Sequence, residues 1–298
     1  MQQVNTKIAN RVEAIKEDKV HGATWLSEEA ISILTQAVQE SRAENLRDFI
    51  TELKEITNAL TQARPNMASI TNYACWFTYE VIAHSQKESD LNSLKALAKA
   101  KGNEIIEVAR QAVLKVVRNG TNIIQPSDTI MTCSYSATVC QCFEIAKAEN
   151  KDFHVVIAES KSPDSKLYGE VTAKQLRLSG ISTKVIRDDE IVKYMPHASK
   201  VLVGADSALR DGSLINGTPT YVLASAASVA HIPFYSLCQT AKFDPRSYQG
   251  KNRKLEAGFD KIPPQLVTGI ITEFGIIKPR QVPHYTKEIE RNRQVLSG

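Results

Sequence analysis

The aspartate Asp206 directly follows the run VLVGA at residues 201–205. A run of this kind is typical of a buried strand, and burial at its end raises the pKa of a carboxyl group. A carboxyl group with a raised pKa suits proton transfer near neutral pH. The next residues, SALRDGSLINGTPTY at 207–221, are mostly small or polar and include Asn216. This segment is therefore a candidate ligand-binding rim, with Asp206 at its start.

Hydroxyl, thiol and ammonium groups follow other short apolar runs in the same half of the chain. Cys133, Ser134 and Ser136 come after the run DTIMT, and Lys161 and Lys242 follow two further runs. Serines where a strand passes into a helix lie beside unpaired backbone N–H groups, and the helix dipole favours an anion there. The sequence therefore predicts a phosphate site at these positions, to which the two lysines add positive charge.

Each of these residues also has a plain structural alternative. A serine after a strand commonly caps the next helix, and an aspartate there often accepts N–H groups of its own loop. Cys133 is a candidate nucleophile, and equally a buried, inert thiol. A binding site is favoured because all of the candidates follow strands of one expected sheet.

Short β-rich runs alternate with helical segments after residue 120. The candidate strands cover residues 128–133, 153–158, 182–187, 200–205 and 234–238. Apolar strands joined by helical crossovers are typical of a parallel sheet covered on both faces. Such sheets bind ligands in the crevice beyond the carboxyl ends of their strands. The expected fold class is therefore α/β in this half, with the candidate residues at one edge of the sheet.

Residues 1–120 show helical spacing instead. One apolar stripe recurs at intervals of three and four residues: Leu46, Phe49, Ile50, Leu53, Ile56 and Leu60. Pro65 marks the end of this helix, and Gly120 after a basic last turn marks the end of another. We therefore expect an all-helical domain over residues 1–120, followed by an α/β domain over residues 121–298.

Composition narrows the class of protein further. The 298 residues carry a net charge of +4 from 37 basic and 33 acidic residues, which are interspersed along the chain. Nucleic-acid binding needs a segregated basic surface, so nucleic acid is not an expected partner. The five cysteines form no CxxC pair, and neither a disulfide framework, a metal site nor a cofactor is expected. No apolar run approaches the roughly 18 residues of a membrane span, and without a signal peptide the expected location is the cytoplasm.

Six blocks of the sequence match one protein family in the family's own order. They are HGAT (21–24), IMTCSYSATV (130–139), ESKSPDSKLYG (159–169), GADSALRDGSLIN (204–216), IPFYSLCQTAKFD (232–244) and FDKIPPQLVTGIITEFG (259–275). Together they resemble the alpha, beta and delta subunits of translation initiation factor 2B, over nearly the whole chain. Relatives in this family include methylthioribose-1-phosphate isomerase and ribose-1,5-bisphosphate isomerase. The resemblance implies a helical N-terminal domain and a Rossmann-like C-terminal domain that dimerises.

The resemblance also implies catalytic roles that this chain keeps only in part. In the isomerases the first strand ends in Thr-His-Cys with a catalytic cysteine, and the Gly-Ala-Asp motif carries the catalytic aspartate. Asp206 matches that aspartate. Cys133 stands where the isomerases have histidine, and Ser134 stands where they have the cysteine.

The positively charged positions of the isomerases differ here as well. Asn216 matches the asparagine of their Asn-Lys pair, whereas Gly217 replaces the lysine. Lys161 stands for the arginine of their Glu-Thr-Arg-Pro block, and His21 stands for the arginine of their Arg-Gly-Ala loop. The resemblance implies that this loop contributes three ligand-binding residues: His21, Gly22 and Ala23.

Two functions of different classes follow from these matches and departures. The first is a non-catalytic protein of the initiation factor 2B alpha type, which binds a phosphorylated sugar or nucleoside monophosphate and contacts initiation factor subunits. It is favoured because a serine hydroxyl shuttles protons poorly unless a base activates it. The alternative is an isomerase of an aldose 1-phosphate to a ketose phosphate that uses Asp206 with Cys133 or Ser134. In both cases the apolar run 218–239 is expected to form the surface of a homodimer or larger homo-oligomer.

Overall fold

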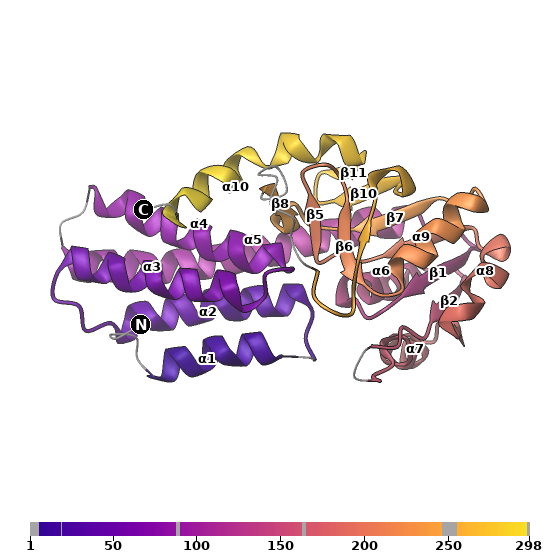
Figure 1. Ribbon diagram of the computed structural model, residues 1–298, viewed down its shortest axis with the longest axis horizontal. Coiled ribbons are helices and arrows are strands. Elements are labelled where there is room, and N and C mark those ends of the chain that lie inside the picture. Colours follow the sequence, from indigo (N-terminus) through magenta and orange to yellow (C-terminus); the bar gives the residue numbers. More distant parts are fainter. Residues whose placement is uncertain (1–5, 19, 88–89, 163–164, 246–254, 297–298) are drawn as a thin grey trace. The chain divides into compact units, whose positions relative to one another are not determined.

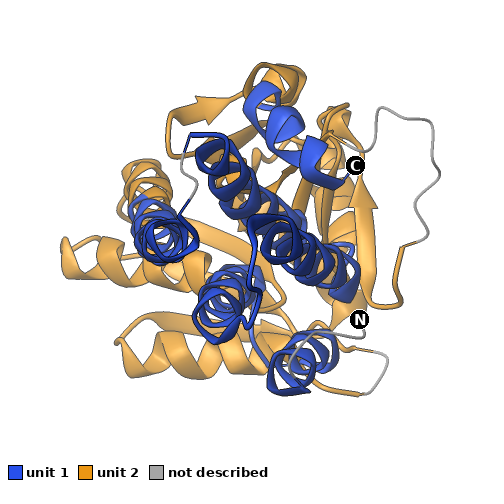
Figure 2. Ribbon diagram, turned by 90° about the vertical axis from the view of Figure 1, so that its left-hand side faces the viewer, with its two compact units in different colours: residues 1–111, 286–298 blue, residues 112–285 orange. Residues whose placement is uncertain are grey.

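The computed structural model describes residues 6–18, 20–87, 90–162, 165–245 and 255–296. The chain divides into two compact units, residues 1–111 with 286–298 and residues 112–285 (Figure 2). Within the described ranges, no helix combines the length and the apolar character that crossing a lipid bilayer requires.

In the described residues of the first unit, all regular secondary structure is helical (Figure 1). Its elements are α1 (Thr6–Glu17), α2 (Ala23–Glu40), α3 (Leu46–Ala63), α4 (Ala68–Ser85), the first part of α5 (Leu91–Asn122), α10 (Lys287–Asn292) and the 3₁₀ segment η7 (Arg293–Leu296). The expected apolar stripe of α3 is buried at Phe49, Leu53 and Leu60. Asn45 accepts the Asp48 N–H at 2.9 Å and so caps the start of this helix.

The second unit is built on a seven-stranded sheet in the order β11-β10-β7-β4-β1-β2-β3. Its strands are β1 (Thr129–Cys133), β2 (His154–Ala158), β3 (Ser182–Ile186), β4 (Lys200–Val203), β7 (Phe234–Leu237), β10 (Gly269–Thr272) and β11 (Gly275–Ile277). All neighbours pair in parallel except β10 and β11. The five strands expected from the sequence are thus confirmed, and so is the α/β fold class.

Helices connect these strands and bury the apolar face of the sheet. They are α6 (Ala137–Ala148), α7 (Tyr168–Leu178), α8 (Ile191–Tyr194) and α9 (Thr220–Val229), with 3₁₀ segments η1 (Asp188–Glu190) and η2 (Met195–His197) beside α8. Ile130, Val155 and Leu202 of three strands pack in one core with Phe143 of α6 and Leu176 of α7. This core fixes the carboxyl ends of the strands relative to one another.

A second sheet lies in the segment that follows Asp206. Its four strands are β5 (Ser207–Leu209), β6 (Leu214–Gly217), β8 (Phe243–Asp244) and β9 (Phe259–Ile262), in the order β8-β5-β6-β9. Residues 207–217, the first part of the segment predicted to be a ligand-binding rim, form an antiparallel hairpin. Its turn contains Gly212 at a φ of +85°, a conformation that favours glycine.

Helix α5 ends two residues later than expected, at Asn122, and so continues through Gly120. A Cβ atom at Gly120 would lie 2.9 Å from Cys142 Sγ and 3.0 Å from Leu237 Cδ2. The glycine therefore serves close packing of α5 on α6 and β7, and it does not terminate the helix.

Candidate functional site

The end of β1 is held by neighbouring polar side chains. Ser134 follows the strand with a φ of +60°. Its N–H donates to Ser160 Oγ at 2.6 Å, and Thr172 Oγ1 donates to its carbonyl oxygen at 2.7 Å. A Cβ atom at Gly217 would lie 2.9 Å from Ser134 Oγ. The end of β1 and the end of β6 are therefore in direct contact through Ser134 and Gly217.

Ser136 caps a helix, which is the structural alternative to ligand binding considered for serines that follow a strand. It is the N-cap of α6, and its hydroxyl accepts the Val139 N–H at 3.4 Å. A Cβ atom at Gly204 would lie 2.7 Å from the same Oγ, so the hydroxyl also lies against the residue that follows β4. Capping does not use all of the hydroxyl's hydrogen-bonding capacity, because a hydroxyl has one proton and two lone pairs.

Cys133 belongs to a buried hydrogen-bond network. Its Sγ lies 3.2 Å from Thr220 Oγ1, and Asn216 Nδ2 donates to the same oxygen at 2.9 Å. The Thr220 hydroxyl donates to the Gly217 carbonyl at 2.5 Å, so the Cys133 S–H is the donor toward Thr220. Burial raises the pKa of the Cys133 thiol to about 12. The thiol is therefore neutral at physiological pH.

Asp206 lies just beyond β4 and is partly buried. Its N–H donates to the Ile215 carbonyl at 2.9 Å, which ties it to β6. The neighbouring Ala205 carbonyl accepts a hydrogen bond from the Nζ of Lys242 at 2.8 Å. Lys242 is buried in the 3₁₀ segment η3 (Thr240–Lys242). A carboxylate and an ammonium group thus occupy neighbouring positions at this end of the sheet.

The loop after β2 is fixed through its backbone. Asp188 accepts the N–H groups of Ser160 at 2.9 Å and Lys161 at 3.1 Å. Because Ser160 Oγ accepts the Ser134 N–H, this loop is joined to the end of β1. Lys161 is exposed, and no hydrogen bond or ion pair joins its ammonium group to the described part of the chain. Pro163 and Asp164, in the block at 159–169, lie outside the described residues.

The HGAT loop belongs to the helical unit. His21 Nδ1 lies 2.7 Å from Asp18 Oδ2, and its ring stacks on Trp25 with 3.8 Å between the ring centroids. Gly22 is the N-cap of α2, and Ala23 is its first, buried residue. A ligand-binding role for these three residues stays a prediction.

Asp260 is a carboxylate beside the site that sequence reasoning did not single out. It lies opposite Asn216 in the β6–β9 ladder. Its Oδ2 accepts the Tyr221 N–H at 2.9 Å, at the start of α9. Burial raises the pKa of Asp260. One sequence signal could have identified Asp260: it lies in the family-like block at 259–275. That block is distant in sequence from Asn216, so the sequence alone does not indicate that the two residues are neighbours.

The side chains near these strand ends suit recognition of a polar ligand. They include the Asp206 carboxylate and the Ser134 and Ser136 hydroxyls. The buried Asn216 amide donates to Thr220, and the buried Lys242 ammonium group donates to the Ala205 carbonyl next to Asp206. These groups can hydrogen-bond sugar hydroxyls and, with the cation, an anion. Among the described residues, no group of three or more histidine, cysteine, aspartate or glutamate side chains is placed to hold a metal ion.

Comparison with known proteins identifies relatives of two kinds. A protein of Pyrococcus horikoshii named putative translation initiation factor eIF-2B subunit 2-like is 31% identical, over 89% of this chain and 94% of its own length. A ribose 1,5-bisphosphate isomerase of Thermococcus kodakarensis is 27% identical, over 90% of this chain and 89% of its own length.

A solved structure and a family profile agree with these relatives. A chain of the tetrameric eIF2B-beta2-delta2 complex from C. thermophilum has the same fold, with a TM-score of 0.82 and 22% identity over 97% of this chain and 96% of that chain. The profile of the Initiation factor 2 subunit family matches residues 19–258. This protein therefore belongs to the initiation factor 2 subunit family, which holds both eIF-2B subunit-like proteins and isomerases of sugar phosphates.

Proposed function

We propose that this protein is a non-catalytic, regulatory member of the initiation factor 2B alpha type that binds a sugar phosphate or a nucleoside monophosphate. The observation that carries the proposal is the chemistry at the end of β1. The Cys133 thiol is buried and neutral, with a pKa of about 12. The Ser134 hydroxyl has no hydrogen-bond partner within the described ranges, so no described base activates it. Neither group is set to exchange a proton with a substrate.

The proposed ligand lies at the carboxyl ends of the seven-stranded sheet. Asp206 and Asn216 bind its hydroxyl groups, and Ser134 and Ser136 bind its phosphate. Lys161 supplies a positive charge, since its exposed ammonium group has no described partner. Placement of ligands at this edge is the rule for open parallel sheets. Ligand binding then alters the contacts of this protein with its partners, which are initiation factor subunits and a second copy of this chain.

An isomerase is the second candidate, and its support is the likeness to ribose 1,5-bisphosphate isomerases along most of both chains. The reaction would interconvert an aldose 1-phosphate and a ketose phosphate. In that reading Asp206 moves the proton, with Cys133 or Ser134 in an altered role.

Turnover distinguishes the two candidates. The wild-type protein should not isomerise ribose 1,5-bisphosphate or methylthioribose 1-phosphate, and Asp206→Asn should change ligand affinity only modestly. Ser134→Cys restores a thiol where the isomerases have one, so activity that appears only in this variant would support a scaffold that has given up catalysis. Wild-type isomerisation that falls at least about a hundredfold in Asp206→Asn would establish the isomerase instead.

Thermal unfolding tests the binding site itself. A ligand that binds only the folded state raises the free energy of unfolding by about 2.7 kcal/mol when its concentration is a hundredfold above Kd. Ribose phosphates and nucleoside monophosphates should therefore raise the Tm, and Lys161→Ala should reduce the rise. Lys174→Ala is the matched control, because Lys174 is an exposed lysine of α7. A Tm that no member of the panel moves, or a rise that Lys161→Ala leaves intact, would refute the proposed site.

A further inference from the structure

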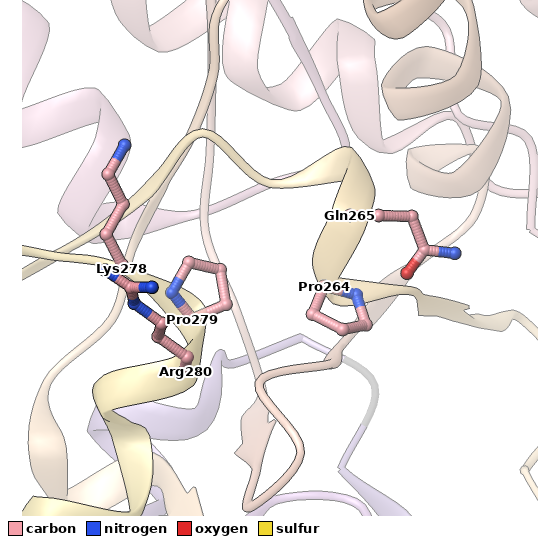
Figure 3. A pocket seen from close by; sticks show the side chains of 5 residues that line it. All are labelled: Pro264, Gln265, Lys278, Pro279 and Arg280. Atoms are coloured by element: carbon pink, nitrogen blue, oxygen red, sulfur yellow. The ribbon is translucent and has the colours of Figure 1, made fainter.

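A hollow of about 350 Å³ lies within the second unit, lined by residues outside the strand-end site. Its lining residues are Pro264, Gln265, Lys278, Pro279 and Arg280 (Figure 3). They come from the 3₁₀ segment η5 (Pro264–Leu266), from Lys278 directly after β11, and from the start of a second 3₁₀ segment, η6 (Pro279–Tyr285). Figure 3 shows Lys278 and Arg280 on the Pro279 side and Gln265 on the Pro264 side.

The apolar walls of this hollow are two prolines, Pro264 and Pro279. Both prolines have a φ angle that the ring fixes. Pro279 also packs tightly against Gly212 in the β5–β6 turn, since a Cβ atom at Gly212 would lie 2.6 Å from Pro279 Cβ. Gly212 has a φ of +85°, so both sides of this contact are held by their backbone conformation. These constraints restrict movement of the Pro279 wall of the hollow.

The two positive charges at the hollow lack acidic partners among the described residues. The Lys278 ammonium group donates only to the Thr268 carbonyl, at 3.1 Å. The Arg280 guanidinium makes no hydrogen bond or ion pair within the described ranges. Asp211, next to Gly212 in the turn, pairs with Lys261 at 3.7 Å. The charge at the hollow is thus complementary to an acidic ligand.

The shape of the hollow favours a protein segment over a metabolite. Small-molecule sites enclose about 70–90% of their ligand, whereas this hollow is lined by only five residues and opens to solvent. The exposed Ile276 lies two residues before Lys278 on the edge strand β11, which adds apolar surface close by in the chain. We propose that the hollow binds an acidic, extended segment of a partner protein. An apolar or proline side chain of that segment packs between Pro264 and Pro279, and its carboxylates pair with Lys278 and Arg280.

A labelled acidic peptide tests this proposal on the full chain. The probe is a fluorescein-labelled peptide of sequence Glu-Glu-Leu-Pro-Glu-Glu, and its binding is followed by fluorescence anisotropy at low and physiological salt. We expect saturable binding that weakens with salt, and a loss of affinity of about tenfold in Lys278→Gln/Arg280→Gln. Arg187→Gln is the control, because Arg187 is an exposed cation of the same unit that pairs with Asp189. The side-chain amide resonance of Gln265 should shift when the peptide binds.

Several outcomes overturn the proposal. Equal affinity for wild type and Lys278→Gln/Arg280→Gln would do so, as would equal binding of a peptide with glutamine in place of glutamate. Displacement of the peptide by inorganic phosphate beyond that by chloride at the same ionic strength would assign the hollow to a small anion. Binding of phosphatidylserine vesicles that needs both cations, without peptide binding, would assign it to a membrane surface. Each result is independent of ligand binding at the strand ends, which the Tm panel reports.

Discussion

A catalytic thiol needs both a sulfur atom and an accessible position. At the end of β1, these two properties belong to two adjacent residues. Cys133 has the sulfur but is buried, with its S–H directed to Thr220. Ser134 lies where the chain leaves the strand, but it carries a hydroxyl. A proton shuttle needs a group that is both accessible and of suitable pKa. Because neither Cys133 nor Ser134 has both properties, we favour a binding function over catalysis.

We expect Cys133 in the folded protein to resist alkylation by iodoacetamide at pH 8. Burial raises the pKa of this thiol from 9.0 to about 12, so the reactive thiolate is scarce at pH 8. Peptide mapping by mass spectrometry should show Cys133 modified only after unfolding in urea. Rapid modification of the folded protein would contradict the proposed neutral thiol and would favour the isomerase.

The same pKa shift sets a direction for stability at alkaline pH. The folded state holds this proton more tightly than the unfolded state, so the free energy of unfolding falls as pH rises from 9.0 toward about 12. Cys140, Cys142 and Cys238 are buried with pKa values raised to about 12 as well, and they act in the same direction.

The packing of helix α5 depends on the absence of a side chain at Gly120. Replacing this residue with alanine favours the helix by about 1 kcal/mol. The new methyl group, however, meets Cys142 Sγ at 2.9 Å and Leu237 Cδ2 at 3.0 Å. Overpacking of this kind costs about 1–3 kcal/mol. We therefore expect Gly120→Ala to lower the free energy of unfolding, by up to about 2 kcal/mol.

Urea unfolding of Gly120→Ala with and without Cys142→Ala measures this effect. Removing the sulfur relieves part of the overlap, so the cost of Gly120→Ala should be smaller in the Cys142→Ala background. A Gly120→Ala protein more stable than wild type would mean that α5 has room at this position and that the glycine is not needed for packing.

The sequence was informative where the pattern of an element is local. The runs that became β2 and β4 are nearly continuous in apolar residues, and the stripe of α3 repeats every three to four residues. Strands β4 and β7 have only four residues each, but they alternate with helical segments along the chain, and this alternation predicts them. Strands β5, β6, β8 and β9 have only two to four residues each, which is too short for a periodic signal. The hairpin over 207–217 therefore escaped sequence analysis.

Parts of the candidate site escaped for a related reason. Asp260 reaches the site only because β9 pairs with β6, and its hydrogen bond to Tyr221 joins residues 39 apart. Asp188 holds Ser160 across 28 residues. Asp206 and Ser134 directly follow predicted strands, so the sequence alone identifies them as candidates. A residue on a strand that is distant in sequence cannot be identified in this way.

The fold of the helical unit depends on contacts between segments that are distant in sequence. In the helical unit, Arg293 near the end of the chain is buried and its Nε donates to Asn72 of α4 at 2.7 Å. Arg291 lies over the ring of Tyr79 of the same helix, 4.9 Å from the centroid. The segment that contains Arg291 and Arg293 is therefore part of the helical core. Its short apolar pattern alone does not predict this position.

We expect the protein to be a dimer at micromolar concentration, through a surface that includes α9. Tyr221, Val222 and Val229 expose 46%, 43% and 83% of their surface on this helix, which leaves apolar area suited to a self-complementary interface. Sedimentation velocity should give the mass of two chains, and Val222→Glu/Val229→Glu should shift the equilibrium toward the monomer because it places carboxylates in the interface. Leu178→Glu is the control, since Leu178 is 82% exposed at the end of α7. A wild-type monomer at this concentration would contradict the expectation, and dissociation by Leu178→Glu alone would move the interface to α7.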